Sequence, residues 1–368
     1  MAGEKSPGWR DRWTVMRNRI LSDAGFQRWA SGFPLTRPVA RARARGLFDI
    51  VAGFVYSQVA FACVKLGVLP LLAEKPRTVE ELAGLVDLPL EGADRLLKAA
   101  VSLGLAERLR DGRYTLGQQG AALVGNGGLA DMIAHHAHLY ADLADPVALL
   151  RRGGGGGALS GYWPYAEGEG PADSAAVAPY SALMAASQPM IADDVLSAYA
   201  FGNHRALLDV GGGEGAFLEA AGARYPELGL MLFDLPAVAA RAQARIGPRL
   251  NALGGNFGDD PIPQGADIIS LVRVLHDHGD AMVTQLLAKV RAALPPGGTL
   301  LVAEPMAETR GAEPAGDAYF GFYLLAMGSG RPRTAAELTG MLRAAGFANV
   351  RQIPTRIPLS VRVLVATA

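Results

Sequence analysis

The chain has 368 residues, half of them hydrophobic, which is long for one small domain and sufficient for two domains with a large buried core. The formal net charge is zero, which argues against a nucleic-acid-binding protein whose whole surface is basic. A single cysteine, Cys63, excludes a disulfide scaffold and fits a reducing compartment, so we expect a cytoplasmic protein.

Residues 1–45 form a basic N-terminal arm. They contain ten Lys or Arg residues against Glu4, Asp11 and Asp23, a net charge of +7, so the remainder of the chain sums to −7. Aromatic residues are interleaved with these charges: Trp9, Trp13, Phe26, Trp29 and Phe33. Two interpretations stay open. The arm is either a solvated tail or a peripheral contact with an anionic membrane, on the cytoplasmic face of the inner or photosynthetic membrane, where each basic residue contributes on the order of 1 kcal/mol.

Residues 46–75 are predicted to be helical and largely buried. The apolar run Ile50–Val64 is interrupted by Ser57 and Gln58 and includes no uncharged apolar stretch long enough to span a bilayer. It is also too hydrophobic for an exposed helix. We therefore expect this helix to be buried against a second copy of the chain.

Two helices and a hairpin follow this region. Thr78 and Glu81 have the spacing of a helix capping box, an amphipathic helix covers GADRLLKAAVSLGLAERL, and Asp111-Gly112 marks a tight hairpin turn. This order is typical of a winged-helix-like domain, which we assign to residues 46–125. Such a domain binds DNA or dimerises. Because its acidic residues at least match its basic ones, we expect a homodimer and no nucleic-acid partner.

Residues 126–200 are predicted to be a helical linker that contributes to a substrate pocket. The five glycines from Gly153 to Gly157 cannot hold a helix and mark a flexible loop. His135, His136 and His138 cluster in AHHAHLY, but no cysteine or carboxylate except Asp131 lies nearby, so we expect a pocket wall or hydrogen-bonded core histidines and no metal.

Residues 201–368 show the alternation of apolar strands and helices that predicts an α/β fold with a parallel sheet. The helix after the fourth strand is predicted to take Asp280 as its N-cap, and a later helix takes Thr334 with Glu337 three residues on. Two strand-like runs near 348–353 and 360–366 have no helix between them, so a terminal antiparallel hairpin is expected.

The first strand of this domain runs into a glycine loop, DVGGGEGAFLEA. Glycines allow a sharp turn and a close approach of the backbone to a ligand before a helix begins. Asp234 ends the second strand, where a carboxylate can accept two ribose hydroxyls. The glycine spacing also satisfies a dinucleotide pattern. However, the charge of Asp209 would oppose a pyrophosphate and suit a cationic sulfonium ligand, and GGNF (Gly254–Phe257) offers an amide and an aromatic ring for an adenine.

The segment LVRVLHDHGD, from Leu271 to Asp280, places histidines at the carboxyl end of the fourth strand. A strand ending at Leu275 would put His276 beside the ligand, where a near-neutral pKa lets it accept a proton. A zinc site at His276 and His278 is the alternative. The chain turns at His278-Gly279, however, so we expect Asp277 to brace the turn and His278 to face outward.

In combination, DVGGGEG, FDLP, GGNF, RVLHDHGD, PPGGTLLVAEP and RPRTAAEL resemble the plant-type class I S-adenosyl-L-methionine (SAM)-dependent O-methyltransferases over residues 45–366. The resemblance implies a Rossmann-like methyltransferase domain over residues 201–368 behind a dimerisation domain that closes the substrate pocket. It also implies that His276 is the general base and that Glu304 orients the imidazole. The plant enzymes have a second such carboxylate where this chain has Pro332.

The resemblance further implies the ligand contacts. Asn256 replaces the usual aspartate of the family and retains an oxygen for the adenine amino group, while Arg273 contacts the cofactor through its backbone. The full set of implied SAM-binding residues is Gly211, Asp234, Gly255, Asn256, Phe257, Arg273 and Gln188. Met184 and Gln188 close over the methionine moiety, and the substrate pocket is assigned to Met184, Tyr180, Tyr323 and Met327.

The arm, the glycine loop and GYWPYAEGEG look closest to one bacterial branch, the hydroxyneurosporene methyltransferases, which act on the tertiary hydroxyl of an acyclic carotenoid. The resemblance implies an apolar polyene substrate. Two other enzymatic functions stay open, O-methylation of a phenolic polyketide and C-methylation of a tetrapyrrole. A SAM-binding winged-helix regulator is the non-enzymatic alternative.

Overall fold

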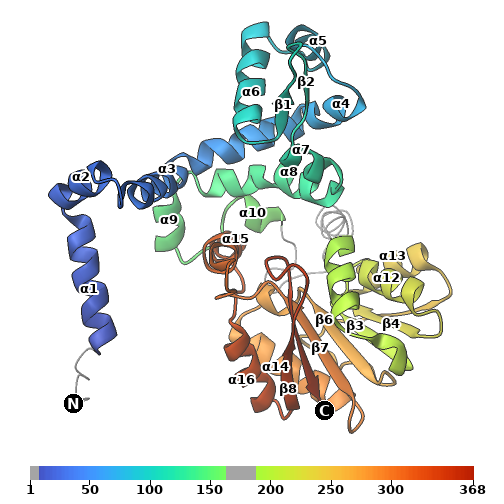
Figure 1. Cartoon of the computed structure of the whole chain (residues 1–368). Coiled ribbons are helices and arrows are strands. Elements are labelled where there is room, and N and C mark those ends of the chain that lie inside the picture. Colours follow the sequence, from blue (N-terminus) through green and yellow to red (C-terminus); the bar gives the residue numbers. More distant parts are fainter. Residues whose placement is uncertain (1–7, 163–187) are drawn as a thin grey trace. The chain divides into compact units, whose positions relative to one another are not determined.

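The computed structural model describes residues 8–162 and 188–368, and the chain divides into two compact units, residues 1–121 and 122–368 (Figure 1). The division falls close to the predicted end of the winged-helix-like domain at residue 125. Tyr180 and Met184, which we assigned to the substrate pocket, lie outside the described residues.

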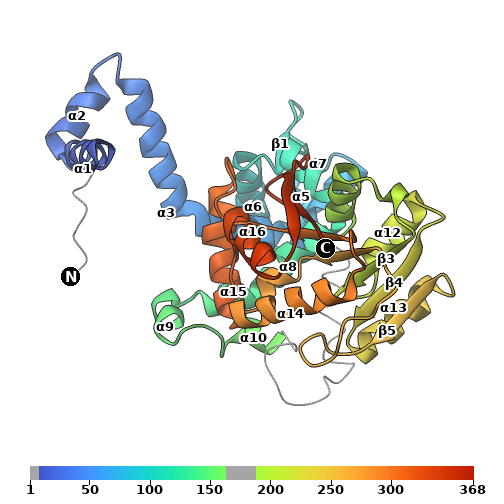
Figure 2. The ribbon, with the colours of Figure 1, turned by 90° about the horizontal axis from the view of Figure 1, so that it is seen from below.

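The first unit is mainly helical. Figure 2 shows its first three helices as separate segments in chain order. Its elements are α1 (Trp9–Ser22), α2 (Ala24–Gly32), α3 (Arg37–Lys65), α4 (Val68–Glu74), α5 (Val79–Leu85), α6 (Leu90–Ser102), β1 (Ala106–Arg108), β2 (Tyr114–Leu116) and α7 (Gln118–Val124), which continues past the division.

The predicted winged-helix-like elements are confirmed. Thr78 accepts from the backbone of Glu81, whose side chain accepts from the backbone of Thr78, so α5 begins with the capping box. The strands β1 and β2 pair in antiparallel register, and Gly112 takes φ +88° in the turn between them. Helix, helix and hairpin therefore follow in the expected order.

Much of residues 46–75 is exposed in the single chain. Helix α3 buries only Cys63, while Ile50 is 79% exposed and Phe54 is 72% exposed. The burial predicted for this helix requires a second chain, which the structure of one chain does not contain. By length and composition alone, α3 could also cross a membrane, a criterion that a buried core helix meets as well.

The second unit contains helices α8 to α10 and then the sheet domain. Its helices are α8 (Gly127–Asp142), α9 (Pro146–Arg151), α10 (Ala158–Tyr162), helical residues 188–198, α12 (Ala216–Arg224), α13 (Pro236–Ile246), α14 (Asp280–Ala293), α15 (Gly321–Met327) and α16 (Ala335–Ala344). The unit also contains the short 3₁₀ helices η1 (Phe201–Asn203) and η2 (Leu275–Asp277) and the π-helix η3 (Pro314–Phe320). The strands are β3 (Ala206–Val210), β4 (Gly229–Asp234), β5 (Leu250–Gly254), β6 (Ile268–Val272), β7 (Thr299–Glu304), β8 (Ala348–Ile353) and β9 (Arg362–Thr367).

These strands form one seven-stranded sheet in the order β5-β4-β3-β6-β7-β9-β8. The first five are parallel, and β9 is antiparallel to both β7 and β8, which confirms the terminal hairpin. The strand order reverses direction between β3 and β6. Side chains at the carboxyl ends of these two strands therefore meet at a topological switch point, where open α/β sheets bind ligands.

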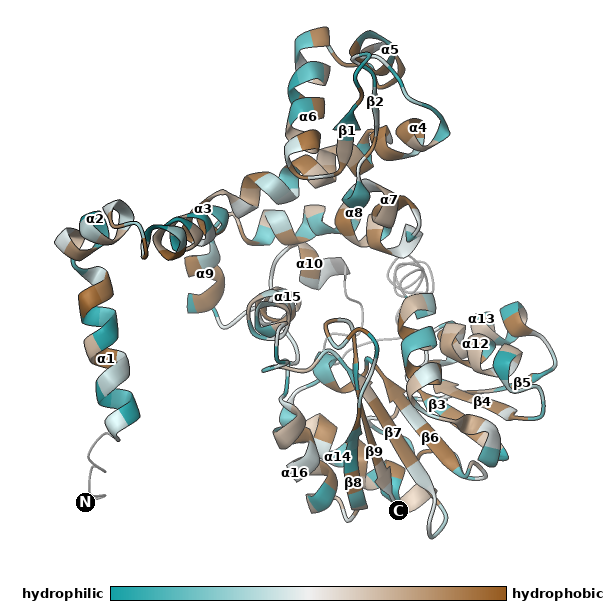
Figure 3. Ribbon diagram, viewed as in Figure 1, coloured by the Kyte–Doolittle hydropathy of each residue, from teal (hydrophilic) through white to brown (hydrophobic). Residues whose placement is uncertain are grey.

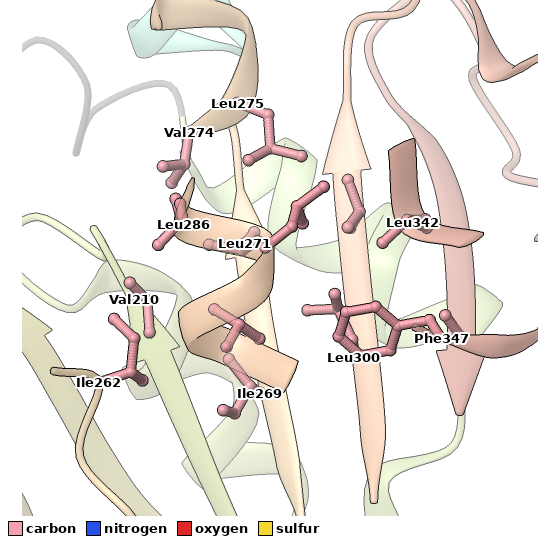
Figure 4. Close-up of a cluster of buried hydrophobic side chains, with 14 of the residues drawn as sticks. Val210, Ile262, Ile269, Leu271, Val274, Leu275, Leu286, Leu300, Leu342 and Phe347 are labelled. Atoms are coloured by element: carbon pink, nitrogen blue, oxygen red, sulfur yellow. The ribbon is translucent and has the colours of Figure 1, made fainter. Parts of the chain in front are cut away.

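Alternate strand residues pack on opposite faces of the sheet, as a period of two requires. On one face, Leu208, Ile269 and Leu300 pack against α14 and α16 (Figure 4). On the other face, Leu207 and Ile268 pack against α12, α13 and helical residues 188–198. The strands are hydrophobic along most of their length (Figure 3), which is the pattern of a sheet covered on both faces.

One polar pair interrupts this core. Asp209 and Ser270 face each other in register on β3 and β6, and the Ser270 hydroxyl donates to the Asp209 carboxylate at 2.6 Å. Burial raises the pKa of Asp209 to about 7 although the hydrogen bond from Ser270 opposes the shift. The folded state therefore binds a proton at Asp209 that the unfolded chain has already released between pH 4 and 7.

This raised pKa predicts how stability varies with pH. Because the folded state holds the extra proton, ionisation of Asp209 should lower the free energy of unfolding as pH rises from 4 to 7, by at most about 4 kcal/mol. Asp209→Asn keeps an acceptor for Ser270 but cannot ionise, so its stability should fall less over this range. Urea unfolding across this range measures both slopes, and equal slopes for the two proteins would rule out the raised pKa.

Candidate active site

The glycine loop after β3 turns back on itself at the carboxyl edge of the sheet. Gly211 and Gly213 take φ +70° and +59°, which L side chains rarely adopt. A side-chain carbon on Gly211 would come within 3.0 Å of Val274, whereas one on Gly213 would meet nothing within 4 Å. The loop therefore packs against Val274 at Gly211, whereas its backbone at Gly213 is open to a ligand.

Asp234 lies against this loop at the end of β4. Its carboxylate accepts from the backbone nitrogens of Gly213 at 2.8 Å and of Leu235 at 2.7 Å. Burial raises the pKa of Asp234 to about 6, although these two hydrogen bonds and Arg241 stabilise the charged form. Asp234 is a buried residue, with 8% of its surface exposed. A carboxylate in this position can accept hydroxyl donors from a ribose.

Two polar residues expected at the ligand have partners within the protein. Asp209 does not face a ligand, because its side chain is buried and bonded to Ser270. The side-chain oxygen of Asn256 already accepts from Gly258 at 2.9 Å, and its amide donates to Asp259. Asn256 therefore closes the turn after β5, as Asn side chains do in Asx turns.

Neighbouring residues of that turn do approach the glycine loop. A side-chain carbon on Gly211 would lie 3.7 Å from the Phe257 ring. The rings of Phe257 and His278 pack edge to face, with their centroids 5.2 Å apart. His278 is half-buried, so the expectation that it faces outward is wrong. Gly255 has no room for a side chain, since an added carbon would lie 2.5 Å from Phe233.

The segment that carries His276 is more sharply bent than the sequence predicts. Strand β6 ends at Val272 rather than at Leu275, and Arg273 takes φ +58°, a left-handed conformation that is costly for a residue with a side chain. The η2 turn then follows and holds His276. We call residues 273–278 the base loop.

Glu304, at the end of β7, fixes the base loop. One of its oxygens accepts from the backbone nitrogens of Val274 at 3.0 Å and Leu275 at 2.6 Å. The other oxygen contacts Nδ1 of His276. One buried carboxylate thus holds both the backbone and the ring, which leaves Nε2 as the nitrogen available for chemistry.

Asp277 contacts that second nitrogen, a contact that the sequence analysis missed. Its Oδ1 lies 3.1 Å from His276 Nε2. Burial lowers the pKa of His276, but the carboxylates of Asp277 and Glu304 outweigh burial and raise it well above the ordinary imidazole value. The two carboxylates therefore favour the imidazolium form of His276, whereas the sequence predicted a near-neutral pKa.

The segment around Pro332 holds the same loop from its other side. Four consecutive carbonyls, those of residues 275–278, each accept one hydrogen bond from it. The donors are Arg333 Nη1 to Leu275 at 2.6 Å, Arg331 N to His276 at 2.9 Å, Ser329 Oγ to Asp277 at 2.7 Å and Arg333 Nη2 to His278 at 2.8 Å. At Pro332, where the plant-type pattern has a carboxylate, the neighbouring residues Ser329, Arg331 and Arg333 hold the backbone that carries His276.

Arg333 in turn is fixed by Asp280, whose carboxylate lies 2.7 Å from Nη2. Asp280 was expected to cap α14, but the N-cap is Gly279 and the carboxylate binds Arg331 and Arg333. The guanidinium groups hold the pKa of Asp280 below its usual value. The second predicted cap is confirmed, since Thr334 and Glu337 form a capping box.

His276 and Asp277 line an apolar pocket of about 260 Å³. The pocket wall comes from α8, helical residues from 188 onward, the base loop, η3 and α15. It consists of Asn126, Gly128, Leu129, Met132, His136, Met190, Ile191, Arg273, His276, Asp277, Tyr319, Phe320, Tyr323 and Ser360. Phe320, which the sequence analysis did not single out, meets the His276 ring edge to face at 6.0 Å.

Two histidine–tyrosine pairs build one side of this pocket. His135 Nε2 is hydrogen-bonded to the Tyr323 hydroxyl at 3.0 Å, and His136 Nε2 to the Tyr319 hydroxyl at 2.7 Å. Burial lowers the pKa of His135 to about 4. The prediction of a pocket wall or hydrogen-bonded core histidines is thus confirmed for these two.

Tyr323 lies in the pocket as expected, but Met327 does not. Met327 is buried in the cluster of Leu139, Leu149 and Leu159 beneath α15. A second glycine-rich segment, residues 153–157 between α9 and α10, packs against α15. The backbone nitrogen of Gly155 donates to the Leu325 carbonyl, and a side-chain carbon on Gly154 would lie 2.5 Å from that carbonyl oxygen. Met327 therefore supports the pocket wall from behind.

Gln188 offers a further ligand contact. Its Oε1 is buried and has no hydrogen-bond partner among the described residues. A buried acceptor without a donor is costly, so a ligand that brings an N–H or O–H group here would be stabilised. Within residues 8–162 and 188–368, no group of three or more His, Cys, Asp or Glu residues could hold a metal ion.

Comparison with known proteins is consistent with this geometry. Residues 140–348 match the model of an O-methyltransferase domain, and residues 48–126 match an O-methyltransferase dimerisation domain. Demethylspheroidene O-methyltransferase of Cereibacter sphaeroides is 46% identical over 344 residues, covering 91% of this chain and 90% of that protein.

More distant relatives match most of the chain. Acetylserotonin O-methyltransferase of Mus musculus is 33% identical, covering 83% of this chain and 84% of that protein. The solved structure of human N-acetylserotonin methyltransferase in complex with SAM superposes with a TM-score of 0.75 at 26% identity, covering 88% of this chain and 97% of that one.

Proposed function

Because the chain belongs to the SAM-dependent O-methyltransferase family, we propose that it methylates the tertiary hydroxyl of a hydroxylated acyclic carotenoid, with His276 as the general base. The observation that carries the proposal is the place of His276. Its ring lines an apolar pocket, and Glu304 holds its Nδ1, so that Nε2 is the nitrogen for an acceptor hydroxyl.

The residues around the glycine loop fit SAM as the methyl donor. Gly213 presents accessible backbone, Asp234 offers a carboxylate for ribose hydroxyls, and Gln188 has a buried oxygen without a donor. Phe257 places an aromatic ring beside Gly211. When bound, SAM supplies an electrophilic methyl group on a sulfonium centre.

His276 acts on the acceptor during the transfer and not before it. A tertiary alcohol is a very weak acid, so a free alkoxide does not form at neutral pH. As the new oxygen–carbon bond forms and the carbon–sulfur bond breaks, the hydroxyl proton passes to Nε2 of His276. Holding the acceptor oxygen in line with the methyl group contributes roughly 7–11 kcal/mol.

Asp277 influences the protonation state of His276. In the free site its carboxylate occupies Nε2 and favours the imidazolium. An acceptor hydroxyl at Nε2 takes the place of Asp277, which removes one of the two carboxylates that raise the pKa of His276. Acceptor binding therefore favours the neutral imidazole that the reaction requires.

The pocket lining supports a polyene acceptor. Leu129, Met132, Met190, Ile191 and Phe320 contribute apolar surface, and the polar side chains of Arg273 and Asp277 lie on the same loop as His276. An end of a polyene with one hydroxyl matches this distribution, because it can bury hydrocarbon while presenting oxygen to His276. The similar protein of Cereibacter sphaeroides carries a name that refers to demethylspheroidene.

A homodimer formed through the first unit completes the proposal. The dimerisation-domain match includes exposed apolar side chains of α3: Phe48, Ile50, Val51, Phe54 and Val55. A patch of this kind marks an interaction surface. Burial against the same helix of a second copy removes it from water.

The acceptor class can be tested directly. Incubation of the protein with methyl-labelled SAM and a panel of hydroxycarotenoids, phenols and tetrapyrroles should label an acyclic hydroxycarotenoid, as an ether. Label in a phenol or a tetrapyrrole alone would contradict the carotenoid assignment, and no label in any acceptor would favour a SAM-binding regulator.

Loss of the base should separate chemistry from binding. His276→Ala should lower turnover by roughly 10²–10⁴-fold, the usual contribution of general acid–base catalysis, with SAM affinity nearly unchanged in calorimetry. Glu304→Gln should slow the reaction less, because the imidazole remains. Near-wild-type turnover in His276→Ala would remove His276 from the mechanism.

Asp234→Ala should affect cofactor binding, in contrast to His276→Ala, which should affect turnover. It should weaken binding of SAM and of its demethylated product together, since both carry the same ribose hydroxyls. We expect a loss of about 3 kcal/mol at most, because water replaces part of the lost hydrogen bonding. An affinity within twofold of the wild type would exclude Asp234 as the ribose contact.

The pH dependence should reveal Asp277. The raised pKa of His276 means that the neutral base forms only as pH rises, so kcat/KM should increase with pH to a midpoint above the ordinary imidazole value. Asp277→Asn removes one of the carboxylates at the ring and should shift this midpoint downward. Asp111→Asn is the matched control, because the carboxylate of Asp111 binds Arg113 in the hairpin of the first unit. An unshifted midpoint in Asp277→Asn would refute this role.

The dimer can be broken at α3. Ile50→Glu places a charge on the apolar face and should give a monomer by light scattering, or insoluble protein. Leu85→Glu, on α5, changes a side chain that is 53% exposed in the same unit and should remain dimeric. A soluble dimer of Ile50→Glu would assign the interface to another surface.

A further inference from the structure

Helix α1 carries a row of large apolar side chains on one face. Trp9, Trp13, Met16 and Ile20 recur at spacings of four, three and four residues, which places them within about 60° of one another around the helix. They are 70%, 55%, 47% and 44% exposed, and α1 contains no buried residue. This apolar row therefore has no partner within the described chain.

Arginines border the apolar row on both sides. At about 100° per residue, Arg10 and Arg17 follow it on one flank, and Arg12 and Arg19 on the other. Beside these four arginines the helix contains one acidic residue, Asp11. Its carboxylate accepts a hydrogen bond from the backbone nitrogen of Gly8 at the start of the helix. Figure 3 shows the resulting mixture of hydrophobic and hydrophilic residues on α1.

Helix α2 continues the pattern. The ring of Trp29 stacks on that of Phe33 with centroids 5.3 Å apart, and the ring of Phe26 lies tilted against Trp29 with centroids 5.7 Å apart. Trp29 and Phe33 are largely exposed, and Leu35 beside them is 81% exposed. Tryptophan suits the boundary between hydrocarbon and water, because its ring is apolar and its N–H is polar.

We propose that the apolar row of α1, Trp9, Trp13, Met16 and Ile20, inserts into an anionic lipid surface while the flanking arginines bind the headgroups. The helix then lies in the plane of the interface, as amphipathic helices with basic borders do. A protein partner would not require arginines on both borders of the row, whereas an anionic surface surrounds the helix and attracts both. The inference rests on the proposed function, because a polyene acceptor is stored in membranes.

Vesicle binding by the full-length protein tests this orientation without substrate or SAM. Tryptophan fluorescence is followed with phosphatidylcholine vesicles that contain or lack phosphatidylglycerol, in a variant with Trp9, Trp29 and Trp163 replaced by phenylalanine. Trp13 should shift to shorter wavelength and be quenched by brominated lipid, only on the anionic vesicles. Binding should weaken as salt rises, because exposed charges are screened within about 8 Å at physiological ionic strength.

Variants of the native chain assign the effect to the apolar row. Trp9→Ala with Trp13→Ala should weaken vesicle binding at least tenfold, and Arg12→Gln or Arg19→Gln by roughly fivefold each, as expected for about 1 kcal/mol per basic residue. Val15→Ala is the matched control, since Val15 is 70% exposed but lies outside the row. It should bind like the wild type.

Three results would overturn the proposal. The first is that the protein does not bind anionic vesicles at low salt. The second is that Val15→Ala and the double tryptophan variant weaken vesicle binding equally. The third is that the protein binds no vesicles but forms an oligomer that the double tryptophan variant breaks. The last result would assign the row to a second copy of the chain. Methylation of detergent-dispersed acceptor tests the proposed function separately, because the double tryptophan variant should retain it.

Discussion

The buried carboxylate of Glu304 is the contact on which the candidate site depends. It bonds two backbone nitrogens of the base loop and one ring nitrogen of His276. A carboxylate at the end of β7 thereby links the rigid centre of the sheet to a loop whose own backbone includes a left-handed residue, Arg273. The strain at Arg273 persists because Glu304 on one side and the Ser329–Arg333 segment on the other both hold the loop.

This arrangement explains how the chain differs from the plant-type pattern at Pro332. A carboxylate beside the ring would orient the imidazole and raise its pKa. Here Glu304 holds the ring at Nδ1, and four hydrogen bonds to consecutive carbonyls hold the backbone of the base loop. Asp277 and Glu304 together raise the pKa of His276.

The sequence predicted the fold well because each signal was local and repeated. The strand–helix alternation, the capping boxes at Thr78 and Thr334 and the terminal hairpin all depend on residues near one another in the chain. The burial predicted for α3 involves a second molecule, so in the single chain this helix is exposed. Within the site, motif matching placed His276 and Glu304 together, but it could not predict that Asp277 turns toward Nε2, since that contact follows from the bend after Val272.

The same limit applies to polar residues whose partners are distant in sequence. Asp209 looked like a ligand contact because it precedes the glycines, yet its partner is Ser270 on the adjacent strand. Asp280 looked like a helix cap, but arginines some fifty residues later bind it. Residue type and spacing identify groups that need a partner, and only the fold decides which partner they obtain.

The two histidine–tyrosine pairs have a consequence for how the acceptor pocket can evolve. His135 and His136 each hold one tyrosine, and Tyr319 and Tyr323 lie one helical turn apart. Replacing one tyrosine by a smaller residue would enlarge the pocket but leave an imidazole with a lost hydrogen bond in an apolar wall. Changes in acceptor size along this wall are therefore expected as coordinated replacements on α8 and on the η3–α15 segment, and a designer of new specificity should mutate them as pairs.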